Sequence, residues 1–174
     1  MTVSLKYARV ERERRWLLGS TPELSGSPME ITDRYVLGTR LRLREAAVGE
    51  PVVHKLGHQV RLGSDPAEVA CTSFYLDDAE WSALSVLPAR VLHTQRWRTV
   101  RDGQPVAVDV FGGGLAGLVL AEVDRGSGPD RGLLPGFDPV AEVSSDERLV
   151  GGALAASGRD GLVATLGDYG VHIA

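Results

Sequence analysis

Charged and apolar residues alternate with a period of two in several separate segments of this chain. Successive side chains of a β-strand point to opposite faces, so each such segment would carry one charged face and one apolar face. Gly and Pro gather between these segments, at residues 19–28, 112–117 and 126–136, where we expect loops. About seven or eight strands with few helices predict an α+β protein built on an antiparallel sheet that closes on itself.

The strands can be placed by their alternation and the helices by their capping residues. Residues 31–45 read as one long strand with Gly38 as a bulge, and residues 57–66 read as a polar loop. Asp102-Gly103 is a hairpin signal between two strands. We expect strands over residues 7–17, 31–45, 52–56, 69–76, 91–100, 106–111 and 118–123.

Two helices are expected. Asp77 should cap a helix that runs to about Leu87 and is ended by Pro88. The second should occupy the second half of residues 140–156, with Ser144 or Ser145 as its cap. Residues 161–174 are compatible with either a strand or an ordered tail.

Length and composition favour one soluble domain spanning residues 1–174. The formal net charge of −4 argues against a general nucleic-acid binder. The single cysteine, Cys71, excludes an internal disulfide and fits a reducing compartment. Charges interrupt the first residues too early for a secretory signal, and no stretch is long enough to span a membrane. We therefore expect a cytoplasmic protein with no membrane partner.

The charged faces of the expected strands supply the candidate site residues, beginning with the first segment. On a strand, Glu11, Glu13 and Arg15 share one face; on a solvated surface helix, Glu11 and Arg15 would instead pair four residues apart. Arg34, Arg40, Arg42 and Arg44 share one parity, which either faces solvent on an edge strand or meets anions in a polar interior. The remaining candidates are Lys55, Arg96, Arg98, Asp109, Glu122 and Asp124.

A closed barrel would bring these charged faces together inside. A lone Asp109 among apolar residues is costly to bury without a cation, which the neighbouring arginines or a metal would supply. Carboxylates bind Mg²⁺ or Mn²⁺, the metal neutralises phosphate oxygens, and Arg or Lys binds the others. The pattern therefore favours an interior that holds a metal-bound polyphosphate.

The order of these motifs resembles the CYTH superfamily, the triphosphate tunnel metalloenzymes, over about residues 5–150. The family's Glu-x-Glu-x-Lys strand is matched by Glu11-Arg12-Glu13-Arg14-Arg15, and its final strand signature by residues 117–124, Gly-Leu-Val-Leu-Ala-Glu-Val-Asp. The other matches are Leu41-Arg42-Leu43-Arg44, Lys55-Leu56-Gly57, Arg96-Trp97, Val108-Asp109-Val110-Phe111 and Glu142-Val143-Ser144-Ser145-Asp146.

The resemblance implies an eight-stranded antiparallel tunnel with a few flanking helices that hydrolyses tripolyphosphate, thiamine triphosphate or a nucleoside triphosphate with Mg²⁺ or Mn²⁺. The partner would be polyphosphate or a small molecule that bears a triphosphate, and a homodimer is compatible with the family. By this resemblance Arg15 takes the catalytic position. The metal ligands would be Glu11, Glu13, Asp109, Glu122 and Asp124, and the substrate ligands Arg40, Arg42, Arg44, Lys55, Arg96 and Arg98.

The chain departs from the family pattern at three places. Arg15 replaces a lysine thought to help activate water, and an arginine hardly ever gives up a proton. Thr94 replaces another lysine, and residues 69, 71 and 73 are Val, Cys and Ser where members alternate Glu. Two other functions therefore stay open: a polyphosphate- or nucleotide-binding module of the same fold with weakened catalysis, and a class IV-like adenylate cyclase.

Overall fold

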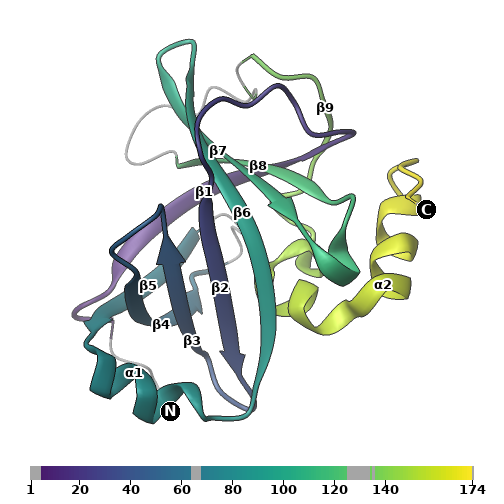
Figure 1. Ribbon diagram of the computed structural model, residues 1–174. Coiled ribbons are helices and arrows are strands. Elements are labelled where there is room, and N and C mark those ends of the chain that lie inside the picture. The colour runs from purple at the N-terminus through teal and green to yellow at the C-terminus, as the bar shows by residue number, and fades with distance from the viewer. Residues whose placement is uncertain (1–4, 64–67, 125–133, 135, 174) are drawn as a thin grey trace.

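The computed structural model describes residues 5–63, 68–124, 134 and 136–173 (Figure 1). Nine strands and two helices account for most of these residues, and two short 3-10 turns lie at Gly113–Leu115 (η1) and Glu147–Leu149 (η2). The strands are β1 (Arg9–Leu18), β2 (Met29–Val36), β3 (Leu41–Ala47), β4 (Val53–Arg61), β5 (Glu68–Leu76), β6 (Ala89–Arg101), β7 (Gln104–Phe111), β8 (Val119–Asp124) and β9 (Pro139–Glu142); the helices are α1 (Asp78–Ser85) and α2 (Gly151–Gly167).

The first eight strands close into the antiparallel barrel that the alternation predicted. The strand order is β5-β4-β3-β2-β6-β7-β8-β1, and pairing of β1 with β5 closes the ring. The amino-terminal part of β1 pairs with β5, and its last residues pair with β9 on the same side while β8 pairs with β1 on the other, so β9 takes the place of β5 beside the end of β1. The eight-stranded α+β fold expected from the sequence is confirmed.

One hairpin replaces the long strand expected over residues 31–45. The segment turns back between β2 and β3, where Gly38 has a φ of 71°, so the expectation of a bulge at Gly38 was wrong. A positive φ is accessible to glycine at little cost, which suits this turn. The Asp102-Gly103 hairpin is confirmed: the two residues have φ angles of 50° and 76°, as a tight hairpin turn requires.

β4 is longer than the sequence indicated. The expected polar loop over residues 57–66 is wrong for its first part, because β4 continues to Arg61, paired with β3 as far as His58 and with β5 throughout. Pairing to β5, joined by β3 over the first two residues, holds this polar segment extended although few of its side chains are apolar. The expected loop at residues 126–136 lies almost wholly outside the described residues.

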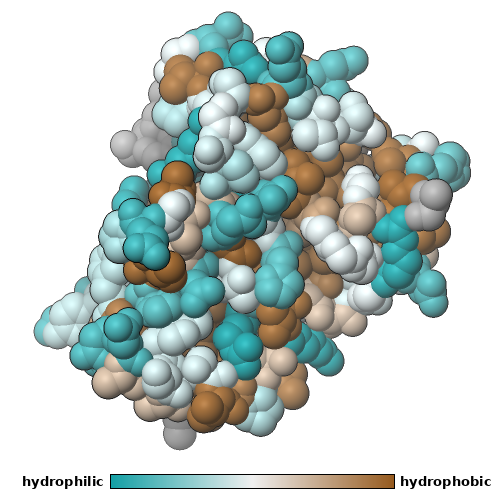
Figure 2. Space-filling view, in the orientation of Figure 1, coloured by the Kyte–Doolittle hydropathy of each residue, from teal (hydrophilic) through white to brown (hydrophobic). Residues whose placement is uncertain are grey.

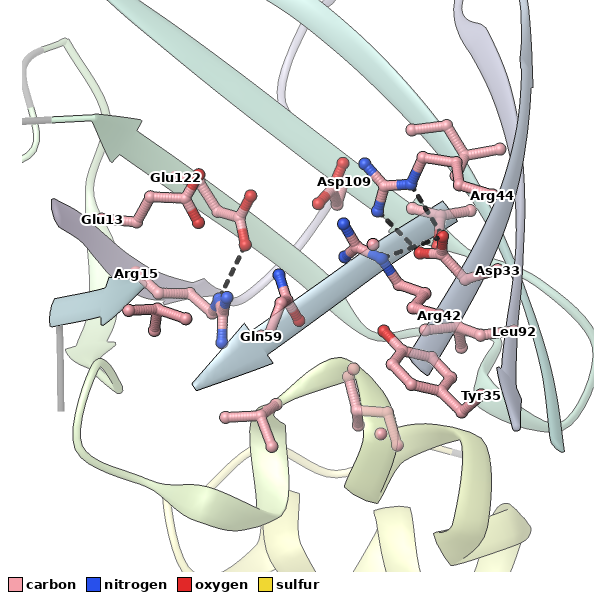
Figure 3. A pocket seen from close by; sticks show the side chains of 18 of the residues that line it. Glu13, Arg15, Asp33, Tyr35, Arg42, Arg44, Gln59, Leu92, Asp109 and Glu122 are labelled. Carbon is pink, nitrogen blue, oxygen red and sulfur yellow. Dashed lines mark hydrogen bonds and ion pairs between the residues drawn. The ribbon is translucent and has the colours of Figure 1, made fainter. Parts of the chain in front are cut away.

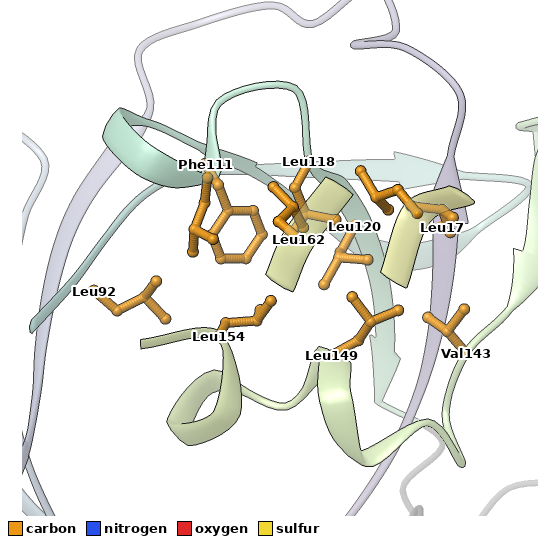
Figure 4. Close-up of a cluster of buried hydrophobic side chains, with 11 residues drawn as sticks. Leu17, Leu92, Phe111, Leu118, Leu120, Val143, Leu149, Leu154 and Leu162 are labelled. Atoms are coloured by element: carbon orange, nitrogen blue, oxygen red, sulfur yellow. The ribbon is translucent and has the colours of Figure 1, made fainter. Parts of the chain in front are cut away.

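A hydrophobic cluster seals one end of the barrel (Figure 4). Leu17 and Leu120 from the strands pack against Leu149 and the leucines of α2. The cluster thus joins α2 to the barrel. In Figure 2, apolar side chains gather where α2 approaches the barrel, while hydrophilic ones are spread over the strands. The buried members are Leu17, Leu92, Phe111, Leu115, Leu118, Leu120, Val143, Leu149, Leu154, Leu162 and Leu166.

The helices show what capping residues can and cannot predict. Asp77 caps α1 as expected, with a reciprocal bond between Glu80 and the cap. For α2 the expected cap was wrong: the helix starts at Gly151 after Val150, without a side-chain cap, and continues through residues expected to be a strand or tail. Packing of α2 on the barrel, rather than local capping, fixes where it lies.

Gly151 allows α2 to approach β2 closely. A Cβ at this position would collide with the hydroxyl of Tyr35, which projects from β2 toward the helix. No helix in the described part of the chain is long and apolar enough to cross a membrane.

Candidate functional site

A cavity of about 570 Å³ occupies the interior of the barrel. Side chains from all eight barrel strands line it, and the start of α2 contributes to one end. Seven cationic side chains and five carboxylates face it, which gives a formal lining charge of +2 in a chain whose net charge is −4. The cations are Arg15, Arg40, Arg42, Arg44, Lys55, Arg61 and Arg96, and the carboxylates are Glu11, Glu13, Asp33, Asp109 and Glu122.

Two arginines hold Glu122 on β8. Arg15 Nε donates to Glu122 Oε1 at 2.8 Å, and Arg96 Nη2 donates to Oε2 at 2.5 Å. Burial alone would raise the pKa of Glu122, but Arg15 and Arg96 outweigh it and lower that pKa to about 2. Glu122 in turn helps to raise the pKa of Arg15 despite the burial of the guanidinium. All three groups therefore stay charged throughout the physiological pH range.

Arg96 also pairs with Asp109 on the neighbouring strand β7. Its Nε and Nη2 donate to the two carboxylate oxygens at 2.7 and 2.5 Å, in the bidentate geometry that suits a guanidinium. This pairing supplies the cation that a buried aspartate among β-branched residues requires.

A second ion-pair group faces the first across the cavity (Figure 3). Arg44 donates to both oxygens of Asp33 at 2.7 Å each, and Arg42 Nε lies 3.7 Å from Asp33 Oδ1. The Nε atom of Arg42 is buried and has no hydrogen-bond partner among the described residues. Arg42 is thus held less closely by Asp33 than Arg44 is, and its side chain lines the cavity.

Glu13 is the carboxylate whose charge is least balanced. Burial, and then the nearby charge of Glu122, raise the pKa of Glu13 to about 7, and the attraction of Arg15 and Arg96 only partly opposes this. Figure 3 shows the two carboxylates next to each other on the β1–β8 wall. A proton or a cation between Glu13 and Glu122 would relieve their repulsion.

These two carboxylates decide whether a divalent metal fits. The described residues contain no group of three or more His, Cys, Asp or Glu side chains arranged to hold a metal. Mg²⁺, however, commonly takes only one or two carboxylates and completes its shell with water and substrate phosphates. Glu13 and Glu122 match that smaller requirement, so the donor set fits a metal that is shared with a phosphate ligand.

Most of the residues singled out from the sequence line this one cavity. They include the expected catalytic residue Arg15. They also include four of the five expected metal ligands, Glu11, Glu13, Asp109 and Glu122, and five of the six expected substrate ligands, Arg40, Arg42, Arg44, Lys55 and Arg96.

Two expected residues lie outside the cavity lining. Asp124 ends β8, and its half-exposed carboxylate lies 4.0 Å from the Arg9 guanidinium. Arg98 is exposed and lies two positions beyond Arg96, where the pairing of β6 with β2 ends. Both have the inward parity, but neither is among the residues that line the cavity. Their expected roles as substrate and metal ligands stay predictions.

Arg34 was wrongly grouped with the three inward arginines of β3. In the β2–β3 hairpin Tyr35 lies opposite Arg42 and Asp33 opposite Arg44. Odd positions of β2 therefore share a face with even positions of β3, which turns Arg34 away from the cavity.

The same hairpin brings in Asp33, which the sequence reasoning missed. Reversing the parity across the Gly38 turn would have found both Asp33 and Tyr35. Gln59 and Arg61 were missed because their segment was taken as a loop, although alternation from Lys55 to Arg61 was present as a signal.

The residues that differ from the family pattern also lie along the cavity. Thr94, Val69 and Ser73 line it, and Cys71 is buried beside Gln59, whose amide lies 3.4 Å from the thiol sulfur. Burial, followed by a hydrogen bond to Glu11, raises the pKa of the Cys71 thiol to about 11, so it stays protonated. The β5 wall is therefore neutral where the family pattern is acidic.

Two solved structures of the protein NE1496 have a similar fold. The inorganic triphosphatase NE1496 matches with a TM-score of 0.57 and 24% sequence identity, over 84% of this chain and 95% of that one. A second structure, described as the hypothetical protein NE1496, matches with a TM-score of 0.56 and 23% identity, over 85% of this chain and 99% of that one. At this level of identity the matches show the fold alone, and they agree with the closed eight-stranded antiparallel barrel expected from the sequence.

No protein-family model matches the chain, and no curated protein matches it.

Proposed function

We propose that this protein binds a triphosphate inside the barrel and hydrolyses it with the help of a divalent cation, Mg²⁺ or Mn²⁺. The observation that carries the proposal is the positive lining of the cavity inside the barrel of an acidic chain. Arginine forks suit phosphate oxygens, and a partly dehydrated cavity strengthens their attraction. The fold shared with an inorganic triphosphatase supports the same ligand class.

The cations that are least engaged by carboxylates would bind the phosphates. The Nε atom of Arg42 is buried and has no hydrogen-bond partner among the described residues. Lys55 lines the cavity on β4, next to Arg44 of the adjacent strand β3. Arg44 and Arg96 already hold carboxylates in bidentate pairs, so they would contribute mainly through their charge and their remaining N–H groups. Arg40 and Arg61 extend this positive surface toward the carboxyl-terminal end of β4.

Glu13 and Glu122 would hold the divalent cation on the opposite wall. The bound cation would neutralise phosphate oxygens and so favour attack of water on the terminal phosphorus. Glu122 is fixed by Arg15 and Arg96, which orients its carboxylate toward the neighbouring Glu13. Arg15 stays protonated and would stabilise the charge of the transition state rather than accept a proton.

In the binding-module alternative, the protein binds the same ligand but hydrolyses it weakly or not at all. It is favoured by Arg15, whose guanidinium cannot serve as a base and whose Nε is committed to Glu122. The class IV-like adenylate cyclase has no comparable observation in its favour.

Release of inorganic phosphate from tripolyphosphate, with Mg²⁺ and separately with Mn²⁺, tests the proposal together with calorimetric binding of a non-hydrolysable imidotriphosphate. Metal-dependent release with saturable binding is expected. Binding without release would select the non-catalytic alternative, and neither binding nor release would reject both.

A further inference from the structure

We propose that Tyr75 is a specificity-determining residue that stacks on a neutral aromatic ring carried by the bound polyphosphate. This inference rests on the proposed function and names the chemical class of the organic group. A nucleobase is the ring type that the charges at the site favour.

Tyr75 belongs to the inward face of β5. It lies opposite Lys55 in the β4–β5 ladder, and the inward-facing Ser73 precedes it by two positions. The Lys55 ammonium lies 4.8 Å from the centroid of the Tyr75 ring. A phosphate bound by Lys55 would therefore lie next to this ring, and so would any group attached to that phosphate.

The ring of Tyr75 is nevertheless open to solvent, with 75% of the residue exposed. Other inward-facing aromatic residues, Tyr35 and Phe111, pack against the hydrophobic cluster at the α2 end. Tyr75 thus contributes little to the core and leaves a flat apolar surface at the rim of the cavity. Such a surface is suited to stacking, because every base presents a π face to an aromatic side chain.

Tyr75 marks the end of the cavity that α2 does not cover. Lys55 lies near the start of β4, whereas Arg61 at its other end pairs with Glu147, shortly before α2. Six residues of strand separate the two ends by roughly 20 Å. A polyphosphate that fills the interior could therefore leave its organic end at the open rim beside Tyr75.

The surrounding charge selects among aromatic groups. The cavity lining is positive, and Lys55 stands directly over the Tyr75 ring. A cationic heterocycle in this position would be repelled by Lys55 and the arginines, whereas a neutral nucleobase would not. The structure therefore favours a nucleoside triphosphate over a positively charged thiazolium ester.

Calorimetry with two non-hydrolysable ligands tests this proposal: adenosine 5′-(β,γ-imido)triphosphate and inorganic imidotriphosphate, both with excess Mg²⁺. Tyr75→Leu should weaken binding of the adenosine ligand about tenfold, and that of the inorganic ligand less than about twofold. Tyr75→Phe keeps the ring and should bind both ligands like the wild type. Phe74→Leu is the matched control, because Phe74 is the adjacent exposed aromatic residue on the outward face of β5.

Each outcome decides the matter. Equal losses for the two ligands, or no loss for the adenosine ligand, would overturn the role of Tyr75 while leaving the proposed function intact. The same holds if Phe74→Leu reproduces the effect. If wild-type protein binds neither ligand, both proposals fail.

Discussion

Arg44 holds Asp33 through two parallel hydrogen bonds of 2.7 Å each, from Nε to Oδ1 and from Nη2 to Oδ2. Asp33 is 3% exposed, so its charge depends on this guanidinium and on the more distant Arg42. The pair lies on the cavity wall and lowers the local positive charge while fixing both side chains. Asp33 therefore affects two quantities at once: the stability of the folded protein and its affinity for an anion in the cavity.

Asp33→Asn should destabilise the free protein by about 3 kcal/mol, because removing one partner of a buried ion pair leaves the other uncompensated. It should also tighten tripolyphosphate binding, since Arg42 and Arg44 lose their competing anion. Urea unfolding with and without tripolyphosphate measures both effects. Glu147→Gln is the control: its carboxylate is 78% exposed and pairs with Arg61, so the expected change in stability is within about 0.5 kcal/mol. Equal stability of Asp33→Asn and wild type would contradict this role of Asp33.

Glu122→Gln should abolish the effect of Mg²⁺ on tripolyphosphate binding while the fold persists. The substitution keeps the shape but removes the charge that a hard cation requires. Affinity measured with Mg²⁺ and with a chelator should differ strongly for the wild type and become similar for the variant. Glu68→Gln alters a carboxylate that pairs with Arg12 outside the cavity lining and should behave as wild type. An unchanged response to Mg²⁺ in Glu122→Gln would place the metal elsewhere.

Glu13 should make stability decrease as the pH rises. Folding raises the pKa of Glu13 from 4.5 to about 7, so the folded protein holds this proton more tightly than the unfolded chain. The resulting stabilisation is fully present below pH 4.5 and is lost as the pH rises through 7. The unfolding free energy of wild type relative to Glu13→Gln should fall by about 2 kcal/mol between roughly pH 5 and 8. Parallel pH profiles for the two proteins would show that Glu13 titrates normally.

Period-two alternation predicted the β1 side of the site correctly because it needs only one strand. Glu11, Glu13 and Arg15 do line the cavity, and the barrel closure that joins them to Glu122 followed from the number of alternating strands. The position of α2 could not be predicted from local signals. It begins with two glycines and no side-chain cap, and long-range packing on the barrel holds it in place.

Sequence alternation could not predict the face of every residue, because it does not show how a turn relates two neighbouring strands. Parity says which residues share a face within a strand, but a hairpin can exchange the parities of its two strands, as the Gly38 turn does for Arg34 and Asp33. Alternation also does not show which of the inward-facing residues line the cavity. Arg98 and Asp124 have the correct parity and still lie outside the cavity lining.

Arg15→Lys should raise the turnover of tripolyphosphate. The dissociation constant of tripolyphosphate should change by less than about a factor of three. A lysine keeps the positive charge next to Glu122 but can lose a proton or reorient water more readily than the guanidinium. Steady-state kinetics with Mg²⁺ and Mn²⁺, alongside calorimetry, separates the two effects. Arg12→Lys, on the opposite face of β1, is the control and should leave turnover unchanged. Vigorous wild-type turnover that Arg15→Lys lowers would show that the arginine is competent and would eliminate the binding-module alternative.

The location of a bound anion tests the central claim most directly. A crystal structure with tripolyphosphate and Mn²⁺, whose anomalous signal identifies the metal, would show both ligands at once. We expect the phosphates inside the barrel against Arg42 and Lys55, and Mn²⁺ between the phosphates and the carboxylates of Glu13 and Glu122. Tripolyphosphate bound only on the outer surface, with the cavity between Arg42 and Glu122 filled by water alone, would contradict the account.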